Sequence, residues 1–540
     1  MLCAGGVRPA RAQVLAQKNW AGSGVTVQVW WQRGVFYRID PSKFQDAAPD
    51  RRGDGRGDLM GIDQRLDYLQ SLGVDAVILE TTPEAAGAEV TPAQAKAVGM
   101  MPTAEVGEAF DTLVRDAIGR HLRVLVELGA PASQQGDAQY LAAARAWLNQ
   151  GAAGIYVPTR ALEQVDGAEH IALLLQELRA LTDGFPGERV LLADAPGEQD
   201  FVLQDALAKY TQLTASAPLG ELGKGGAMPT AAELRAAWMA ELGEAPASTQ
   251  AVSTVVTKTV KRVVVRHGRK HVVTETVRSW SKPHSTAQGV ANPLLVAARV
   301  PAMKDPAQRL ALERTLAVMT LASKSAVLLE YGQELGLEMA GGRAALMQWT
   351  PTNLTRKPPT VVEKPSPPPV SQYKGFLPWV KPLPRNYFPP PVMPVVEESD
   401  KPVPVDPALL PGFTTGDVDA AMEASNRVRA NVASETYEDG SLLNLYKQLI
   451  VLHHDNMTVR SGVMEVLNHD DVDALVWVRR APASSRISTT VVAACNLSDR
   501  PVVLSDLGTV TVKVMRSLLV PAPGDLLKVG AGDVMVGETR

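Results

Sequence analysis

The sequence predicts an α/β protein in which a (β/α)8 TIM barrel is followed by a C-terminal antiparallel β-sandwich. In the N-terminal half, short apolar strands alternate with amphipathic helices. The strands are almost uninterrupted apolar runs, which is typical of a parallel sheet covered on both faces. After residue 441 one helix is followed only by short strands, which indicates an antiparallel domain. The 540 residues are enough for both parts.

The first repeating unit lies near the N-terminus. Val35–Ile39 is a β-branched and aromatic run, which predicts a strand. Apolar residues recur at helical spacing over Ile62–Leu72, and Gly73 ends the predicted helix. Asp75–Leu79 is a second apolar strand. Strand, helix and strand in this order form a βαβ unit, whose two strands are parallel.

The same alternation continues through three further units. A closed barrel accommodates so many parallel strands at this chain length better than an open sheet does. The predicted helices are Phe110–Ile118, Ala138–Leu148 and Ile171–Leu181, and the predicted strands are Leu122–Leu128, Ala153–Val157 and Arg189–Asp194.

The pattern divides the chain into three parts. Residues 1–24 form an N-terminal segment, 25–440 the barrel, and 441–540 a connecting helix with the sandwich. The helix is expected over Leu442–Leu452. The sandwich strands are expected over Ala474–Arg480, Ser488–Leu497, Thr509–Met515 and Asp533–Gly537.

Composition and charge exclude several classes of protein. The net charge of −4 predicts no bulk affinity for nucleic acid. Two cysteines exclude a scaffold held by many disulfides, and no apolar run is long enough for a transmembrane helix. Ala10, Arg11 and Ala12 resemble a signal-peptidase site. Residues 1–24 are therefore expected to be a remnant of an export signal, with a periplasmic or extracellular location; the alternative is a disordered cytoplasmic N-terminus.

Residues 254–282 interrupt the barrel pattern and predict a long basic β-hairpin. Valines alternate with basic residues, so one face is expected to pack and the other to carry positive charge. We expect the hairpin to contact an acidic partner, a phosphate surface or another polyanion; the alternative is a solvated ribbon. The expected contact residues are Lys258, Lys261, Arg262, Arg266, Arg269 and Lys270.

Residues 357–411 form a second interruption and contain 17 of the 39 prolines. Such a segment is expected to run extended, largely as polyproline II. Its aromatic residues would anchor it on a partner, or on the barrel itself. The expected anchors are Phe376, Trp379, Tyr387 and Phe388.

Several motifs resemble the α-amylase superfamily of glycoside hydrolases, on its α-glucosidase and oligo-1,6-glucosidase side. The most specific is the run GDGRGDLMGIDQRLDYLQSLGVDAVIL at residues 53–79. The resemblance implies a (β/α)8 barrel and carbohydrate chemistry. It also implies a sizeable domain between the third and fourth strands, where this chain has only Ala130–Ala152. The other similar segments are residues 30–46, 331–337, 347–349 and 441–456.

The resemblance also assigns the three catalytic acids of the family to positions in this chain. Those positions hold Pro158, Asp194 and Leu294, and neither proline nor leucine can supply a carboxyl group. Glu127 and Glu198 show no pairing with a second acid in the sequence. These substitutions predict a pseudoenzyme without glycosidase chemistry. The alternatives are an active glycoside hydrolase or transglycosylase with a relocated acid pair, and a carbohydrate-binding protein.

The loop before residue 59 resembles the calcium loop of the same family. Asp50, Asp54 and Asp58 would supply carboxylates and Arg56 a carbonyl oxygen, which are the hard ligands that calcium prefers. Arg52 stands where the family has an Asn ligand, so a plain turn is the alternative. No other cofactor is expected.

The sequence as a whole favours a structural or accessory subunit of a larger assembly. The basic hairpin and the proline-rich arm would provide its contacts with protein subunits, of the same or a different chain. His453 and His454 are adjacent on a predicted helix and are expected at the surface, because neighbouring residues do not share a helix face.

Overall fold

The structure is a computed structural model of the 540-residue chain, and it describes most of the barrel and of the C-terminal domain. The described residues are 29–47, 57–81, 102–129, 137–164, 166–195, 200–217, 228–241, 255–266, 269–280, 293–300, 303–337, 339–340, 343–344, 346–349, 354–355, 360–362, 395–397, 403–404, 413, 430–467, 473–481, 489–504, 516–520, 525 and 528–539.

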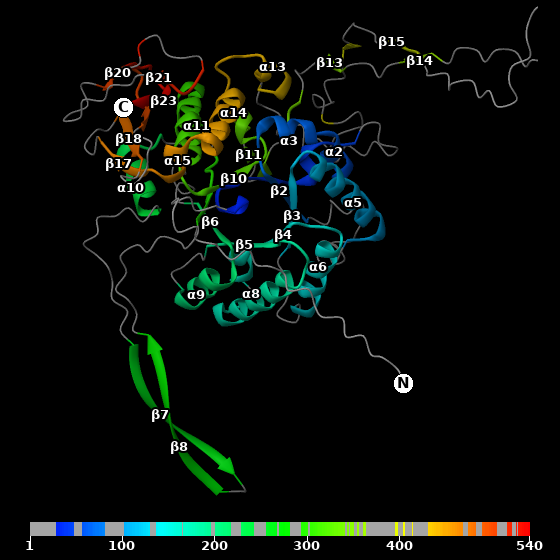
Figure 1. The fold of residues 1–540 in the computed structure, drawn as a ribbon, viewed down its shortest axis with the longest axis vertical. Coiled ribbons are helices and arrows are strands. Elements are labelled where there is room, and N and C mark those ends of the chain that lie inside the picture. Colours follow the sequence, from blue (N-terminus) through cyan, green and yellow to red (C-terminus); the bar gives the residue numbers. More distant parts are fainter. Residues whose placement is uncertain are drawn as a thin grey trace, which may run out of the picture.

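Eight strands form a closed barrel in which every neighbouring pair is parallel, which confirms the predicted fold class. Figure 1 shows the helices packed around it. In their order around the barrel, the strands are β1 (Val35–Ile39), β10 (Ala326–Glu330), β9 (Pro293–Val296), β6 (Leu213–Ser216), β5 (Val190–Asp194), β4 (Gly154–Val157), β3 (Arg123–Glu127) and β2 (Ala76–Glu80).

The barrel has an inner and an outer core because side chains alternate along each strand. Phe36, Tyr156 and Leu328 belong to the inner cluster that fills the barrel. Val35 and Tyr37, which flank Phe36 in the sequence, belong to the outer cluster between strands and helices. Burial on both faces explains why the strands are apolar throughout.

The helices cover the outside of the barrel and continue into the C-terminal domain (Figure 1). The predicted helix Ile62–Leu72 is two helices, because Arg65 leaves the helical conformation between them. Gly73 ends the second with a left-handed φ of 94°. The main helices are α2 (Leu59–Gln64), α3 (Leu66–Leu72), α5 (Ala104–Gly119), α6 (Asp137–Asn149), α8 (Ala168–Asp183), α9 (Phe201–Tyr210), α10 (Ala231–Glu241), α11 (Pro306–Leu321) and α14 (Leu442–Asp455).

Shorter helices lie at the ends of these elements. Among the described residues, no helix combines the length and the apolar character that crossing a membrane requires. The short helices are η1 (Trp30–Arg33), α1 (Pro41–Phe44), α7 (Thr159–Leu162), η4 (Gln333–Leu335), α13 (Val432–Thr436) and α15 (Met457–Ser461).

The C-terminal domain is an antiparallel sheet with a smaller second sheet, which fits the predicted sandwich. The indole of Trp238 in α10 packs edge-on against Trp477, with 4.7 Å between ring centroids. The larger sheet has the order β17 (Val463–Val466), β18 (Ala474–Arg480), β19 (Thr490–Asn496), β23 (Val534–Thr539) and β21 (Arg516–Ser517), and the smaller one pairs β20 (Val502–Val503) with β22 (Lys528–Val529). The predicted strand Thr509–Met515 lies outside the described residues.

The predicted hairpin is formed by β7 (Val255–Arg266) and β8 (Arg269–Trp280), which pair along their whole length. Figure 1 shows it as an arm extending away from the barrel and the C-terminal sheet. The pairing register corrects one expectation, since residues that share a face alternate along each strand. The basic residues fall on both faces of the ribbon, so no face is left purely apolar.

The proline-rich arm is only partly described. Against the expectation of little strand structure, Thr360–Val362 (β14) pairs with Val395–Glu397 (β15). Leu354–Thr355 (β13) likewise pairs with Val403–Pro404 (β16), and two further short strands, β11 (Met339–Ala340) and β12 (Arg343–Ala344), pair with each other. The four expected aromatic anchors, Phe376, Trp379, Tyr387 and Phe388, lie outside the described residues.

His453 is wholly buried, which corrects the expectation that it lies at the surface. Its Nδ1 and Nε2 atoms lie 3.0 and 3.1 Å from the backbone oxygens of Leu321 and Arg33. The guanidinium of Arg33 donates in turn to the His453 carbonyl oxygen at 2.6 Å. His454 is part-exposed and contacts Asp75 at 2.9 Å. The histidine pair therefore joins α14 to the start of the barrel.

We expect the stability of the protein to fall in mild acid because of His453. Burial, together with the charge of Arg33, lowers the pKa of His453 to about 4. The unfolded chain then binds an extra proton between that value and the ordinary histidine pKa, so stability is full at pH 7 and declines as the pH falls below about 6.5. From pH 7 to pH 5 the loss attributable to His453 is about 2 kcal/mol.

Urea unfolding at pH 7 and pH 5 measures this loss. The His453→Gln variant is less stable at both values but has a shallower pH dependence. The matched control His454→Gln keeps the slope of the natural protein. Equal slopes for the natural protein and His453→Gln would contradict the prediction.

Candidate functional site

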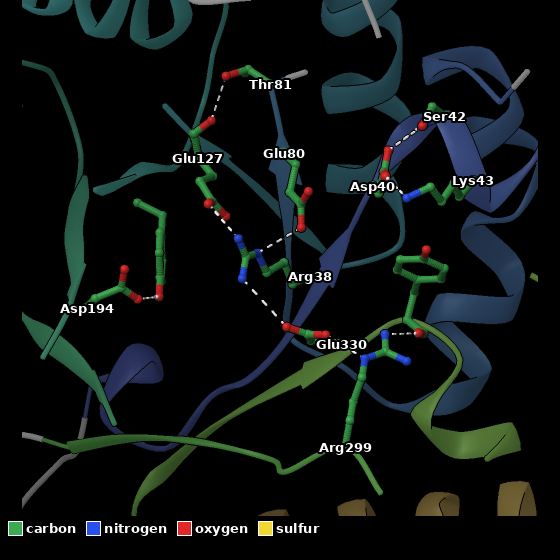
Figure 2. A network of polar contacts seen from close by, with 12 residues as sticks. Arg38, Asp40, Ser42, Lys43, Glu80, Thr81, Glu127, Asp194, Arg299 and Glu330 are labelled. Atoms are coloured by element: carbon green, nitrogen blue, oxygen red, sulfur yellow. Dashed lines mark hydrogen bonds and ion pairs between the residues drawn. The ribbon is translucent and has the colours of Figure 1, made fainter. Parts of the chain in front are cut away.

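Charged residues stand at the carboxyl ends of five barrel strands. Arg38 is the second-last residue of β1, and Glu80, Glu127, Asp194 and Glu330 are the last residues of their strands. Because the strands are parallel, their carboxyl ends meet at one mouth of the barrel. Figure 2 shows the five side chains gathered there.

Arg38 is the centre of this cluster. Its Nη2 lies 2.6 Å from Glu127, its Nε 3.0 Å from Glu80, and its Nη1 3.6 Å from Glu330. The barrel register produces this arrangement, since β1 lies between β10 and β2, and Arg38 pairs directly with Glu330. The three carboxylates raise the pKa of Arg38 above its usual value although burial alone would lower it. The guanidinium therefore holds the carboxyl ends of several strands together.

A second arginine, Arg299, follows β9 and contacts the same cluster. Arg299 Nε donates to Glu330 at 2.6 Å, and its Nη2 donates to the carbonyl oxygen of Tyr331 at 2.7 Å. Burial would raise the pKa of Glu330, but the charges of Arg299 and Arg38 outweigh it and lower that pKa. Glu330 therefore remains a carboxylate.

Glu127 is set apart from the other acids by its burial. It is 7% exposed, and burial raises its pKa to about 8, against the opposing charge of Arg38. The negative charges of Glu80 and Asp194 add to the increase. Among the described residues, its Oε2 has no hydrogen-bond partner. A glutamic acid in this state carries its proton at neutral pH.

Asp194 lies in a different environment, beside Tyr156. The Tyr156 hydroxyl donates a hydrogen bond to its carboxylate, and Thr159 Oγ1 donates to its backbone oxygen at 2.7 Å. Burial raises the pKa of Asp194, while the tyrosine hydrogen bond and the charges of Arg38 and Arg160 oppose the increase. These contacts stabilise the ionised form of Asp194.

The structure places the other expected acid positions differently. Pro158 follows β4 directly and begins α7, so it is at the mouth but bears no ionisable group. Leu294 is not at the mouth: it pairs with Ala326, the first residue of β10, and lies in the inner core. The assignment of Leu294 to a catalytic position was therefore wrong, because β9 ends at Val296 and Leu294 lies two residues before that end. Glu198 lies outside the described residues.

The calcium loop is described only at its end. Asp50, Asp54 and Arg56 lie outside the described residues. Asp58 begins α2, and its carboxylate accepts from the Gly61 amide at 2.6 Å. No set of three histidine, cysteine or acidic residues in the described part of the chain is arranged to hold a metal ion. Calcium binding stays a prediction.

The sequence analysis did not select several residues of the cluster. Arg38, Glu80, Tyr156, Arg299 and Glu330 were missed. A simple signal marks three of the acids, since each directly ends an apolar strand, as in AVILE, RVLVE and AVLLE. A charged residue at the carboxyl end of a barrel strand is positioned for function.

The fold and the cluster together define a class of protein. Active sites of (β/α)8 barrels lie at the carboxyl mouth, and paired carboxyl groups are the working parts of glycoside hydrolases. The fold and the position of the acids are those found in glycoside hydrolases, and comparison with known proteins adds further evidence.

The chain is similar in sequence to several curated glucosidases. It is 41% identical over 101 residues to the trehalose-6-phosphate hydrolase of Escherichia coli, covering 18% of this chain and 17% of that one. It is 52% identical over 50 residues to a salivary alpha-glucosidase of Anopheles gambiae, covering 9% of this chain and 8% of that one. The matches thus span less than a fifth of those relatives. No protein-family model matches the chain.

The fold extends the likeness to nearly the whole chain. The trehalulose synthase MutB of Pseudomonas mesoacidophila is 16% identical with a TM-score of 0.55, covering 95% of this chain and 99% of that one. Its D200A mutant in complex with glucose gives a TM-score of 0.59 at 15% identity, covering 95% and 100%. The resemblance to the α-amylase superfamily, on its α-glucosidase and oligo-1,6-glucosidase side, is confirmed.

These comparisons overturn the expectation of a pseudoenzyme. The matching relatives are named as hydrolases and glucosidases, and the structural neighbour as a synthase. The structure also bears on one premise of that expectation, the lack of a second acid beside Glu127. The sequence offered no second acid for Glu127, whereas the fold brings Glu127 and Asp194 to one mouth, close enough for their charges to interact.

We expect the Arg38→Leu variant to lose about 3 kcal/mol of unfolding free energy, because it leaves three buried or half-buried acidic side chains without their shared cation. Urea unfolding at pH 7 measures the change. As a control, Arg115→Leu removes an exposed partner of Asp111 in α5 and changes the same quantity by less than about 1 kcal/mol. An Arg38→Leu variant as stable as this control would show that the cluster is not a structural tie.

Proposed function

We propose that this chain hydrolyses α-glucosidic bonds at the carboxyl mouth of its barrel. Glu127 would donate a proton to the leaving oxygen, and Asp194 would act as the carboxylate that activates water. The observation that carries the proposal is the difference between two acids in one mouth. The surroundings of Glu127 raise its pKa to about 8, whereas hydrogen-bond and charge contacts limit the rise at Asp194. Such a difference between two carboxyl groups assigns the acid and the base.

The properties of Glu127 suit a proton donor. Its pKa of about 8 keeps it protonated near neutral pH, and among the described residues no hydrogen-bond partner holds its buried Oε2. Its other oxygen accepts from Arg38 at 2.6 Å, which fixes the side chain in one orientation. Thr81 Oγ1 fixes the backbone by donating to the Glu127 carbonyl oxygen at 2.8 Å.

Asp194 suits the complementary role. The hydroxyl of Tyr156 and the charge of Arg38 favour its ionised form. The residue is only partly buried, so water can reach it. In the proposed step Asp194 takes a proton from water, the water oxygen bonds to the anomeric carbon, and the glycosidic bond breaks. Glu127 gives its proton to the departing oxygen, so atoms and charges balance.

The spacing of the strands favours a mechanism with inversion. Glu127 ends β3 and Asp194 ends β5, with β4 between them. Neighbouring strands are about 4.8 Å apart, so the two strand ends are separated by about 10 Å. Inverting glycosidases hold their carboxyl groups about 6.5–9.5 Å apart to admit a water molecule, whereas retaining ones hold them about 5–5.5 Å apart.

The relatives support the substrate class. Their names include trehalose-6-phosphate hydrolase, alpha-glucosidase and oligo-1,6-glucosidase, all of which concern α-linked glucose. We therefore choose maltose, isomaltose, sucrose, trehalose and trehalose 6-phosphate as test substrates.

Substituting either acid is expected to lower the hydrolysis rate. Glu127→Gln and Asp194→Asn should each reduce kcat/KM by about 10²–10⁴-fold, the usual contribution of a general acid or base. Proton NMR of the fresh product should show the β-anomer of glucose, as inversion requires. The control Glu465→Gln alters an acid of β17 in the C-terminal domain and keeps full activity.

Three outcomes would contradict the assignment. Turnover that survives in both acid variants would come from a contaminant or from other residues. An absence of turnover on all five substrates would reject hydrolysis of α-glucosides. Release of the α-anomer would retain hydrolysis but reject the role of Asp194 as a base.

The pH profile provides a separate test of Glu127. A proton donor works only while protonated, so the rate should be level below about pH 8 and fall tenfold per pH unit above it. Tyr156→Phe removes the hydrogen bond that stabilises ionised Asp194 and should raise the lower pKa of the profile without moving the upper one. A fall that begins below pH 6 would contradict the assignment of Glu127.

We also infer that the protein works as a subunit of a larger assembly, with the β7–β8 hairpin as a contact element. The hairpin is a two-stranded sheet that pairs only with itself among the described residues. Isolated hairpins are marginally stable in water, so a long one is best explained by a surface that it contacts. This role is independent of hydrolysis at the barrel mouth.

A further inference from the structure

The β7–β8 hairpin concentrates positive charge in a chain that is otherwise acidic. Between Val255 and Trp280 the sequence has seven basic residues and one acid, Glu275, so the hairpin carries +6. The whole chain carries −4, and the remainder therefore carries −10. Each copy of the protein thus has a cationic arm and an anionic body.

The pairing register shows how this charge is divided between the two faces of the ribbon. One face bears four basic residues and Glu275, and the other bears three basic residues, so both have a net charge of +3. Both faces also include several valines. The first face has Lys258, Arg262, Arg266 and Arg269, and the second has Lys261, Lys270 and Arg278.

A ribbon with equal charge on both faces can contact a partner with both faces at once. It is therefore suited to a partner that surrounds it rather than to a flat surface, which would contact one face only. Each strand has twelve residues and spans about 40 Å. At 0.1 M salt, charges interact over about 10 Å, so an arm of this length reaches a neighbouring molecule well beyond the range of its own body's field. Figure 1 shows the arm extending from the rest of the chain.

The same features exclude other occupants. Two arms carrying +6 each repel one another, and basic residues on exposed strands discourage edge-to-edge pairing. Residues 255–280 contain no asparagine, glutamine, phenylalanine or tyrosine, so base contacts would depend on their arginines, lysines and histidines and on Trp280. A long nucleic acid would also meet the acidic body of the chain. The body of a second copy has the opposite charge to the arm.

We propose that the hairpin binds the acidic body of a second copy of this chain, so that two copies exchange their arms. This inference rests on the subunit role proposed above, and it names the partner. In a reciprocal exchange the arm of each copy contacts the body of the other copy. The same pair of surfaces is then used twice, and the assembly is closed as a dimer. Because the attraction is between opposite charges, the dimer should weaken as salt rises.

Sedimentation equilibrium of the full chain tests the proposal at 50 mM and 500 mM NaCl. We expect a dimer at low salt, with a dissociation constant that rises about tenfold or more at high salt. The variant Lys258→Thr/Arg262→Thr/Arg266→Thr/Arg269→Thr removes the charges of one face and keeps strand-forming residues. It should be a monomer at both salt concentrations, and so should Lys261→Thr/Lys270→Thr/Arg278→Thr.

The matched control Lys258→Arg/Lys261→Arg/Lys270→Arg keeps every charge and should remain a dimer. Circular dichroism of each variant shows whether the barrel is folded, and the glucosidase assay reports separately on the barrel mouth. A natural protein that stays monomeric at 50 mM NaCl would overturn the proposal, as would a dimer that persists without the charges. A monomer that binds heparin would assign the arm to an external polyanion instead.

Discussion

The guanidinium of Arg38 joins the ends of four neighbouring barrel strands through contacts with Glu80, Glu127 and Glu330. Three acids could not share this mouth without a cation among them, because their mutual repulsion would force each to take up a proton. With Arg38 in place the acids differ: Glu330 is held ionised and Glu127 keeps its proton. The chemistry available at the mouth follows from this division.

Much of the fold could be predicted because each barrel strand and helix has a recognisable apolar pattern within its own short segment. The strands Val35–Ile39 and Arg189–Asp194 were recognised from their apolar runs, and the structure bounds them within a residue. The break at Arg65 escaped notice, since the apolar spacing continues through it. His453 was misplaced because its burial depends on packing between α14 and the distant Arg33. Periodicity along one helix does not contain that information.

The site was harder to predict than the fold, and the reason is spatial. Glu127 and Asp194 are far apart in sequence and become neighbours only because their strands end at one mouth. The resemblance assigned a catalytic position to Leu294, yet the strand begins at Pro293 and places Leu294 within the barrel. A motif that has lost its functional residues does not determine which residue of a strand lies at the barrel mouth. The hydrogen-bonded pairing of the strands does determine it.

The two parts of the chain are held together by buried contacts that do not involve the mouth. Arg479 of β18 is 1% exposed and donates from Nε to the Ala322 carbonyl oxygen at 2.8 Å. Removing it would leave a buried carbonyl without its partner, at a cost in stability rather than in turnover. The hairpin, in contrast, extends from the body that these contacts hold together (Figure 1). The proposed hydrolysis, the domain packing and the proposed self-association therefore depend on separate residues, and each can be altered while the other two are preserved.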